Sequence, residues 1–567
     1  MRRLRPVISP AFAAVAMSLA SCVTLFEPDR AARAPTLEGF GALAMTISTP
    51  VPAAQQGFTQ GLLQTYAFND PEAARAFKAA LAQDPDCAMC AWGVAHALGP
   101  NINAPEREDL TEARRYIALA QRHLDRATPR ERALVEAMAA RYAVGGAQAA
   151  DAPTLAAICG SGAGRNKADP LDLVYAARMR AIADAYPDDP DVLTLYAEAV
   201  MIATRVDWWD RRTGAPAGEI GVVAQRLERV LAQNTDHTGL NHYLIHAVDQ
   251  SPAPQRATAA ADRLGALAPQ SPHLLHMPAH IYVHTARYAD AERVNESALA
   301  AELRQTAKLA AQGFDASRNW DFHNVHFLWY AALMEGHGDV ALAQARRLAE
   351  RAAEGKSVDA EFLRALPLLT LLRLERWDEV LQAPPLNGDA GLATGLREQA
   401  RGVAFVRTGR LAEAQAAAVA VQSGLDSPAL AGKTVFGDDP ARTVLEILAL
   451  RLRGEIALAK GDAGAAADAL RGAVDQEAAL DANEPPLLGD SSRLALGSLM
   501  LRARRWADAE AAFRQDLTDH PGSGWALRGL QQALAAQGKA DAARGTQAEL
   551  MRAWSSADAS LRTAREL

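Results

Sequence analysis

Small and apolar residues recur along the chain at fixed offsets that predict pairs of packed helices. In one segment these residues are Gly61, Ala73, Phe77, Ala80 and Pro85. The same offsets return at Gly497, Ala509, Phe513 and Pro521, and shorter versions begin at Ala279, Gly402 and Gly454. Small residues let two helices cross closely, an aromatic ring fills the gap to the next pair, and proline ends the second helix. The pattern predicts an all-α fold.

This pattern resembles the tetratricopeptide repeat, a unit of about 34 residues that folds as two antiparallel helices. The matches cover most of residues 55–550, and phrases such as Thr408-Gly409-Arg410 fit the tight turn between the two helices. The resemblance implies a right-handed superhelical solenoid. Because histidines are concentrated before residue 385, we expect an N-terminal array over residues 51–385 and a C-terminal array over residues 386–567.

The start of the chain predicts export. Met-Arg-Arg-Leu-Arg is followed by an apolar stretch from Val7 to Ala20, which is typical of a signal peptide, here residues 1–21. Leu19-Ala20-Ser21-Cys22 resembles the bacterial lipobox, which implies cleavage before Cys22 and lipidation of its thiol. A plain signal peptide with a chance cysteine is the alternative. Residues 22–50 would then be a lipidated tether that anchors the protein to the membrane of the bacterial cell envelope, in the periplasm or at the outer membrane.

Composition excludes several other classes of protein. Hydrophobic residues make up 49% of the chain, which excludes a disordered protein. A formal net charge of −8 excludes a general nucleic-acid binder. Cys87-Ala-Met-Cys90 is followed by Ala91 where covalent haem attachment needs histidine, so that cofactor is excluded there. The two cysteines are open to local packing, a structural disulfide or a copper site.

The histidines are distributed unevenly. The sequence has 13 of them, and ten lie between His237 and His337. His276 and His280 are one repeat of 34 residues after His242 and His246. Within each pair the i,i+4 spacing puts both imidazoles on one face of a helix, which is how helices chelate a metal with two histidines. In tetratricopeptide proteins these positions face the concave groove, so the two pairs should face each other there.

Other side chains extend this candidate site. Pro278, between two of the histidines, predicts a kink in their helix. A set of imidazoles with one or two carboxylates suits Cu, Zn or Fe and does not suit Ca or Mg. The additional candidate ligands are His273, His323, His326, Asp249 and Glu198.

The segments Asn241–His246, His276–Tyr282 and His323–Phe327 together resemble a set of secreted bacterial tetratricopeptide proteins that has no settled activity. The resemblance implies a shared groove site and names no reaction. The sequence contains no Gly-x-Ser-x-Gly, no phosphate-binding glycine loop and no His-Glu-x-x-His. The chemistry left open is a metal-dependent oxidase or hydrolase, or metal handling.

A different class of function is a scaffold whose groove holds a partner protein, with the histidines as contact residues. The two functions make opposite demands on geometry. Metal ligands must converge to within about 2.0–2.3 Å of a common point, whereas contact residues would be spread along the groove.

Overall fold

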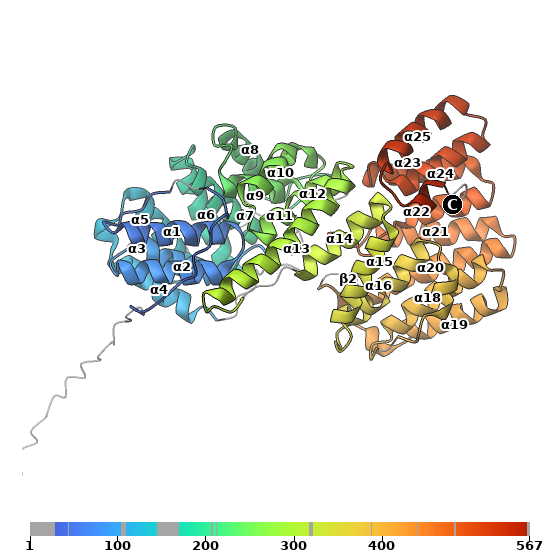
Figure 1. Ribbon diagram of the computed structural model, residues 1–567, viewed down its shortest axis with the longest axis horizontal. Coiled ribbons are helices and arrows are strands. Elements are labelled where there is room, and N and C mark those ends of the chain that lie inside the picture. The colour runs from blue at the N-terminus through green and yellow to red at the C-terminus, as the bar shows by residue number, and fades with distance from the viewer. Residues whose placement is uncertain are drawn as a thin grey trace, which may run out of the picture.

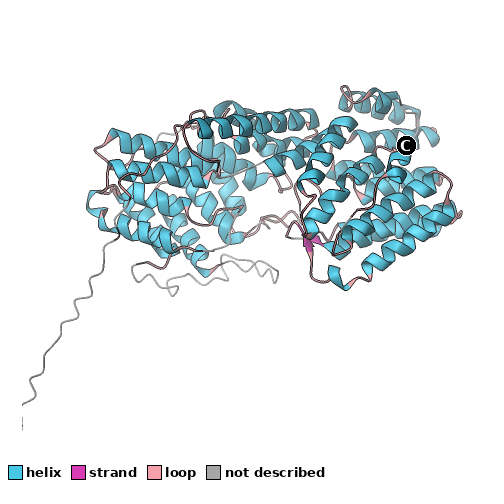
Figure 2. Ribbon diagram, turned by 60° about the horizontal axis from the view of Figure 1, so that its bottom comes forward, coloured by secondary structure: helices cyan, strands magenta, loops and turns pink. Residues whose placement is uncertain are grey.

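The computed structural model describes residues 26, 29–42, 45–103, 109–144, 169–205, 208–210, 213–316, 321–386, 388–437, 439–480 and 483–563. The predicted signal peptide, Cys22 and Cys159 lie outside these residues. Helices are the dominant secondary structure of the described chain, and loops connect them (Figure 2). The two short strands, β1 (Thr434–Val435) and β2 (Asp439–Pro440), pair with each other in antiparallel fashion. The all-α solenoid prediction is confirmed.

The helices form two lobes, which lie side by side in Figure 1 with α14 (Asp321–Glu335) between them. The first lobe contains α1 (Pro52–Tyr66), α2 (Asp70–Gln83), α3 (Ala88–Ala97), α4 (Thr111–Arg122), η1 (Leu124–Arg126), α5 (Pro129–Arg141), α6 (Pro170–Ala185), α7 (Pro190–Thr204), α8 (Ile220–Leu231), α9 (Thr238–Val248), η4 (Pro254–Ala257), α10 (Thr258–Leu267), α11 (Pro272–His276), α12 (Pro278–His284) and α13 (Tyr288–Ala311). The second contains α15 (Gly338–Arg351), α16 (Val358–Arg373), α17 (Trp377–Gln382), α18 (Leu392–Arg407), α19 (Leu411–Leu425), η5 (Pro428–Leu430), α20 (Ala441–Ala459), α21 (Ala463–Glu477), α22 (Ser492–Arg502), α23 (Trp506–Asp519), α24 (Gly524–Ala536), α25 (Ala540–Ala553) and α26 (Ala559–Thr563).

The repeat residues pack as the pattern predicts. A Cβ atom at Gly61 on α1 would lie 2.6 Å from the Phe77 ring of α2, and one at Gly93 on α3 would lie 2.4 Å from the same ring. The buried Phe77 therefore closes its own helix pair and the junction with the next one. Phe513 of α23 stands in the same relation to glycines of α22 and α24. Gly409 adopts a φ of 78° between α18 and α19, the left-handed turn that glycine favours.

The predicted kink at Pro278 is a break in the helix. α11 ends at His276, Met277 caps it, and α12 begins at Pro278. Proline has no backbone N–H to donate to the preceding turn, so the helix is interrupted and a new one begins there. His276 and His280 therefore lie on two short helices rather than on one continuous helix.

Part of the predicted tether belongs to the folded body. Leu37, Phe40, Met45 and Ile47 are buried against the helices. The predicted tether over residues 22–50 thus includes a stretch that packs on the first lobe. Residues 385 and 386 lie between α17 and α18, so the predicted boundary between the two arrays falls in a loop, and it stays a prediction. Within the described residues, we find no helix whose length and apolar character would let it cross a membrane.

Candidate two-metal centre

Three histidines of α9 and α11 converge in the first lobe. His242 and His246 lie one turn apart on α9, and the Nε2 atom of His246 is 3.1 Å from the Nε2 atom of His242. The Nε2 atom of His273, from α11, is also 3.1 Å from that of His242. We call these residues the first triad. One ring nitrogen from each lies within 4.8 Å of the other two, and all three side chains are buried.

A second group of three histidines lies next to the first. His276 of α11 and His280 of α12 place their Nε2 atoms 3.0 Å apart across the break at Pro278. His323 of α14 completes the group, with a ring nitrogen within 4.8 Å of the others. We call these residues the second triad. The ring centres of His246 and His280 are 6.2 Å apart, as are those of His273 and His276, so the triads are neighbours.

The distances within each triad suit a bound metal ion. Ligands held about 2.0–2.1 Å from a tetrahedral ion lie about 3.3 Å from one another. The Nε2–Nε2 distances of 3.1 Å from His242 to His246 and to His273, and of 3.0 Å from His276 to His280, are close to that value. The remaining pairs of ligand nitrogens lie within 4.8 Å. The histidines converge between helices, and their position in the concave groove stays a prediction. Their convergence is the geometry that a metal requires and that a contact surface for a partner does not.

The outer nitrogens of these rings determine where their protons lie. The Nδ1 atom of His242 is 2.7 Å from the Tyr66 carbonyl oxygen and must donate to it. In the second triad, the Nδ1 atom of His276 is 2.7 Å from Asn295 Oδ1, and that of His280 contacts the Glu484 carboxylate. A neutral ring that donates from Nδ1 carries a lone pair on Nε2. The Nε2 atom of His276 therefore presents a lone pair toward His280 Nε2, 3.0 Å away, where a metal ion or a proton on His280 can meet it.

Burial keeps five of the six triad histidines uncharged. It lowers the pKa of His242 and of His323 to about 3, and neighbouring histidines add to the effect. Burial is also the main cause that lowers the pKa of His246, His273 and His276 well below the usual value. Neutral imidazole is the form that ligates metals. These five rings are therefore ready to bind a metal at neutral pH without first releasing a proton.

A phenylalanine ring packs on each triad. The ring centre of Phe68 lies 4.6 to 5.6 Å from the ring centres of the first triad. The ring centre of Phe327 lies 4.6 to 5.1 Å from those of the second triad. Phe68 adopts a φ of 51°, an uncommon conformation for a bulky residue. This left-handed position ends α1, where the Asn69 backbone nitrogen donates to the Gln64 carbonyl oxygen, and the turn places the Phe68 ring against three imidazoles.

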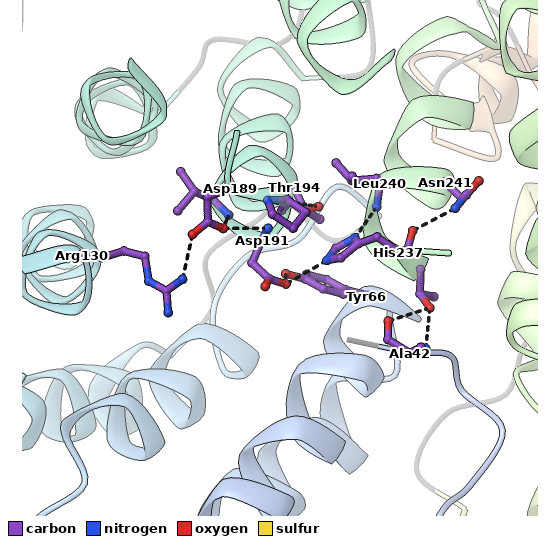
Figure 3. Close-up of polar contacts among 12 residues, drawn as sticks. Ala42, Tyr66, Arg130, Asp189, Asp191, Thr194, His237, Leu240 and Asn241 are labelled. Atoms are coloured by element: carbon purple, nitrogen blue, oxygen red, sulfur yellow. Dashed lines mark hydrogen bonds and ion pairs between the residues drawn. The ribbon is translucent and has the colours of Figure 1, made fainter. Parts of the chain in front are cut away.

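The start of α9 is fixed by a polar network that also holds Tyr66. His237 caps the helix, because its Nδ1 atom accepts from the Leu240 backbone nitrogen (Figure 3). Its Nε2 atom lies 3.0 Å from Asp191, and the Tyr66 hydroxyl donates to the same Asp191 oxygen (Figure 3). Asp191 thus ties the helix that carries His242 and His246 to the residue whose carbonyl orients His242. The network supports the first triad from outside.

The second triad is supported from the other lobe. The Glu484 carboxylate contacts His280 Nδ1 and lies 3.2 Å from His284 Nε2. Burial opposes its charge, but the two histidines hold the pKa of Glu484 well below its usual value. Asp249, whose Oδ2 atom is 3.8 Å from His280 Nδ1, lies beside it, and burial raises the pKa of Asp249 well above its usual value. Both carboxylates face Nδ1 of His280, and the ligand atoms of Asp249, His280 and Glu484 form a third group within 4.8 Å of one another. Asp249 also lies 4.0 Å from His246 Nδ1.

Two predicted ligands lie elsewhere. Glu198 on α7 pairs with His96, whose Nε2 atom is 2.8 Å away, and it is absent from both triads. His326 lies one helical turn after His323 but stacks on Trp329, with the ring centres 5.3 Å apart. His326 is only three residues after His323, but its ring lies in a separate buried contact with Trp329. Cys87 and Cys90 form a disulfide, which decides between the alternatives left open for them.

The sequence analysis missed several residues around the triads. Asn295 occupies the repeat position that Phe77 and Phe513 fill in other units, and this polar replacement was a usable signal for a partner of His276. Glu484 follows a stretch without histidines, 204 residues after His280, and gave no such signal. Phe68 and Phe327 could not be distinguished from core residues in the sequence.

No protein-family model matches the chain, and no curated protein matches it. Three solved structures are similar over most of their length. They are human IFIT1 dimer with m7Gppp-AAAA (10% identity, 89% of this chain and 91% of that one, TM-score 0.29), the APC/C hetero-tetramer Cut9–Hcn1 (11%, 90% and 88%, 0.26) and yeast Tom70 (13%, 88% and 91%, 0.25). At TM-scores below 0.5, these similarities support no conclusion about function.

Proposed function

We propose that this protein binds two copper ions, one in each triad, and uses the pair for oxidation chemistry. The observation that carries the proposal is the convergence of three histidine ring nitrogens in each of two neighbouring groups, all within 4.8 Å of one another in each group. The first triad contains the equivalent histidine pair, His242 and His246, one repeat earlier in the chain, and His273 is its third member.

The choice of metal follows from the donor set. All three ligands of each triad are imidazoles, which suit copper, zinc and iron. Among divalent first-row ions, a nitrogen site holds copper most tightly. Three protein ligands leave a coordination position open at each ion. Two neighbouring copper ions with open positions supply oxygen-dependent oxidation, while this chain's own residues hold the ions, exclude water and fix the protons on the outer nitrogens.

Anchoring in the envelope is a second part of the proposal, and it rests on the sequence Leu19-Ala20-Ser21-Cys22. We propose that lipidated Cys22 holds the helical body at a bacterial membrane. A Cys22→Ala variant should move from the membrane fraction to the soluble fraction, and the wild type should carry the mass of acyl chains. The rival function, a scaffold for a partner protein, stays a prediction and is not favoured by the convergence of the histidines.

Elemental analysis tests the two-metal proposal. The full chain is purified without a histidine tag or chelator and compared with the double variant His242→Asn/His276→Asn. We expect two copper ions per wild-type chain and none in the variant. His326→Asn is the matched control, because it removes a buried histidine outside both triads and should keep both ions. Two zinc ions in place of copper would overturn the oxidation chemistry and indicate hydrolysis instead. The absence of any metal after reconstitution with Cu, Zn and Fe would overturn the whole proposal.

A further inference from the structure

A cavity of about 410 Å³ lies where α12 and α14 meet α21, α22 and α23 of the second lobe. Pockets for small molecules commonly measure about 300–1,000 Å³. Phe327 and Glu484 line this cavity, and both also contact the second triad. A ligand in the cavity would therefore lie directly beside the second triad.

The lining of this cavity is strongly acidic. Arg493 is the single guanidinium among the described lining residues, and it pairs with one of seven carboxylates, Asp519. Arg451, behind the wall, pairs with Asp490 at 2.9 Å. Arg451 also lies 3.6 Å from Glu477, His520 pairs with Asp516, and His284 pairs with Glu484. Burial raises the pKa of Asp249, so a small excess of negative charge remains, and it favours a cationic ligand. The seven carboxylates belong to Asp249, Asp439, Glu477, Glu484, Asp490, Asp516 and Asp519.

One of these carboxylates has an unused acceptor. Asp516 is only 1% exposed. Its Oδ1 atom accepts from the Ser491 hydroxyl and lies 3.1 Å from His520 Nδ1. Its Oδ2 atom has no hydrogen-bond partner in the part of the chain that the structure describes. A buried carboxylate oxygen without a partner is unfavourable. Because this oxygen is shielded from solvent, the Asp516 carboxylate must turn toward the cavity before an ammonium group can donate a charge-assisted hydrogen bond to it.

The opposite wall is apolar. Phe327, Tyr330 and Met334 follow one another on a single face of α14, at spacings of three and four residues. Leu488, from the loop before α22, adds to this surface. An ammonium ion alone would leave these side chains without contacts. The wall therefore suits a ligand that carries an apolar body as well as its charge.

We propose that this cavity binds an amine cation with an aromatic-sized apolar body. The ammonium group donates to Asp516 Oδ2, and the body packs on Phe327 and Tyr330, beside the second triad. The ligand would thus be the substrate class of the copper pair. That last step rests on the proposed function, whereas binding to the cavity does not.

The test measures binding to the full-length, metal-free protein by calorimetry, with 2-phenylethylamine as the probe. 2-Phenylethanol has the same apolar body without the charge, and 3-phenylpropionate has the opposite charge. We expect the amine to bind at least about tenfold more tightly than either, which is the size of one charge-assisted hydrogen bond. Equal affinity for the amine and the alcohol, or no binding of the amine, would overturn the proposal.

Two pairs of variants locate the bound amine. Asp516→Asn should weaken binding about tenfold. Asp508→Asn, on the same helix, makes the same change of charge outside the cavity and should leave affinity unchanged. Because the buried Asp516→Asn change could affect folding, Ala478→Trp provides a second test. Ala478 is exposed at the end of α21 and lines the cavity, so a ring there should block binding, whereas Trp at the neighbouring exposed Ala479 should not. Unchanged affinity in Ala478→Trp would overturn the location.

Metal content and amine binding are measured separately, so the two proposals can fail separately. Copper in the triads without amine binding would overturn the cavity proposal and leave the copper pair. Amine binding without any metal would support the cavity and overturn its role as the substrate site of the pair.

Discussion

The two triads have the same ligands but different surroundings. The first triad lies within the first lobe, on α9 and α11, with Phe68 packed against its rings. The second triad lies at the junction of the lobes, and its Phe327 ring also lines the acidic cavity. The comparison teaches that repeating a motif repeats the ligands without repeating access to them. One ion would be held in a closed site, while the other would lie where a ligand can reach.

The supports of the triads differ in the same way. The first triad is oriented by the Tyr66 carbonyl, a backbone group within its own lobe. The second depends on Glu484, which the second lobe brings to His280. The second ion should therefore be sensitive to how the lobes are joined, and the first should not.

The largest expected effect comes from removing one ligand at a time. His242→Asn should weaken copper binding in the first triad by more than about 100-fold and leave the second ion bound, and His276→Asn should do the reverse. Removing a ligand should weaken copper binding more than removing an outer hydrogen-bond partner does, since one bond to the ion is lost. Copper titration against a competing chelator measures both affinities. Loss of both ions in either variant would mean that the triads act as one inseparable site.

The next effect separates the triads through their outer partners. Glu484→Gln replaces a charged acceptor of the His280 proton with a neutral one, which should weaken copper binding in the second triad about 10- to 100-fold. The first triad, which Glu484 does not contact, should keep its affinity. Glu477→Gln, in the wall of the same cavity, is the control. An equal change at both triads would show that Glu484 acts through the fold rather than through His280.

A third prediction concerns the metal-free protein. The pKa of His242 is about 3 in the folded state and about 6.5 in the unfolded chain, so only the unfolded chain takes up a proton as the pH falls below 6.5. The free energy of unfolding therefore decreases as the pH is lowered. The contribution of His242 is fully present above pH 6.5 and is lost progressively as the pH falls toward 3. Between pH 7.5 and 5.0 this one histidine should remove about 2 kcal/mol.

Urea unfolding of wild type and His242→Asn at both pH values isolates that term, since the other titrating groups are common to both proteins. His323→Asn in the second triad should give a similar difference, because its folded pKa is also lowered to about 3. A difference that is independent of pH would contradict the neutral, buried state of these rings.

Sequence reasoning reached those parts of the molecule that repeat. Gly61 and Phe77 specify a packing between neighbouring helices, so the fold could be read from local spacing. The i,i+4 pairs gave four of the six triad histidines for the same reason, and His273 and His323 were already candidates from their positions.

The grouping of the histidines and their outer partners depend on long-range contacts that no local sequence pattern encodes. The histidines were expected to face each other as two pairs. The break at Pro278 and the packing of α14 instead group them as two sets of three. Glu484 reaches His280 only because the lobes pack together. His326 and Glu198 have the right chemistry, but their neighbours Trp329 and His96 hold them elsewhere.

The smallest expected effect sharpens the contrast in access. Phe68→Leu and Phe327→Leu each remove a ring from three imidazoles, so each should lower the free energy of unfolding by about 1 kcal/mol. Their consequences for the cavity should differ, because Phe327 lines it and Phe68 does not. Phe327→Leu should weaken the binding of 2-phenylethylamine about threefold through the loss of an aromatic contact, whereas Phe68→Leu should leave it unchanged. Urea unfolding measures the first quantity and calorimetry the second. If both variants weakened the amine equally, the two triads would share one access route, and the distinction between a closed and an accessible ion would be wrong.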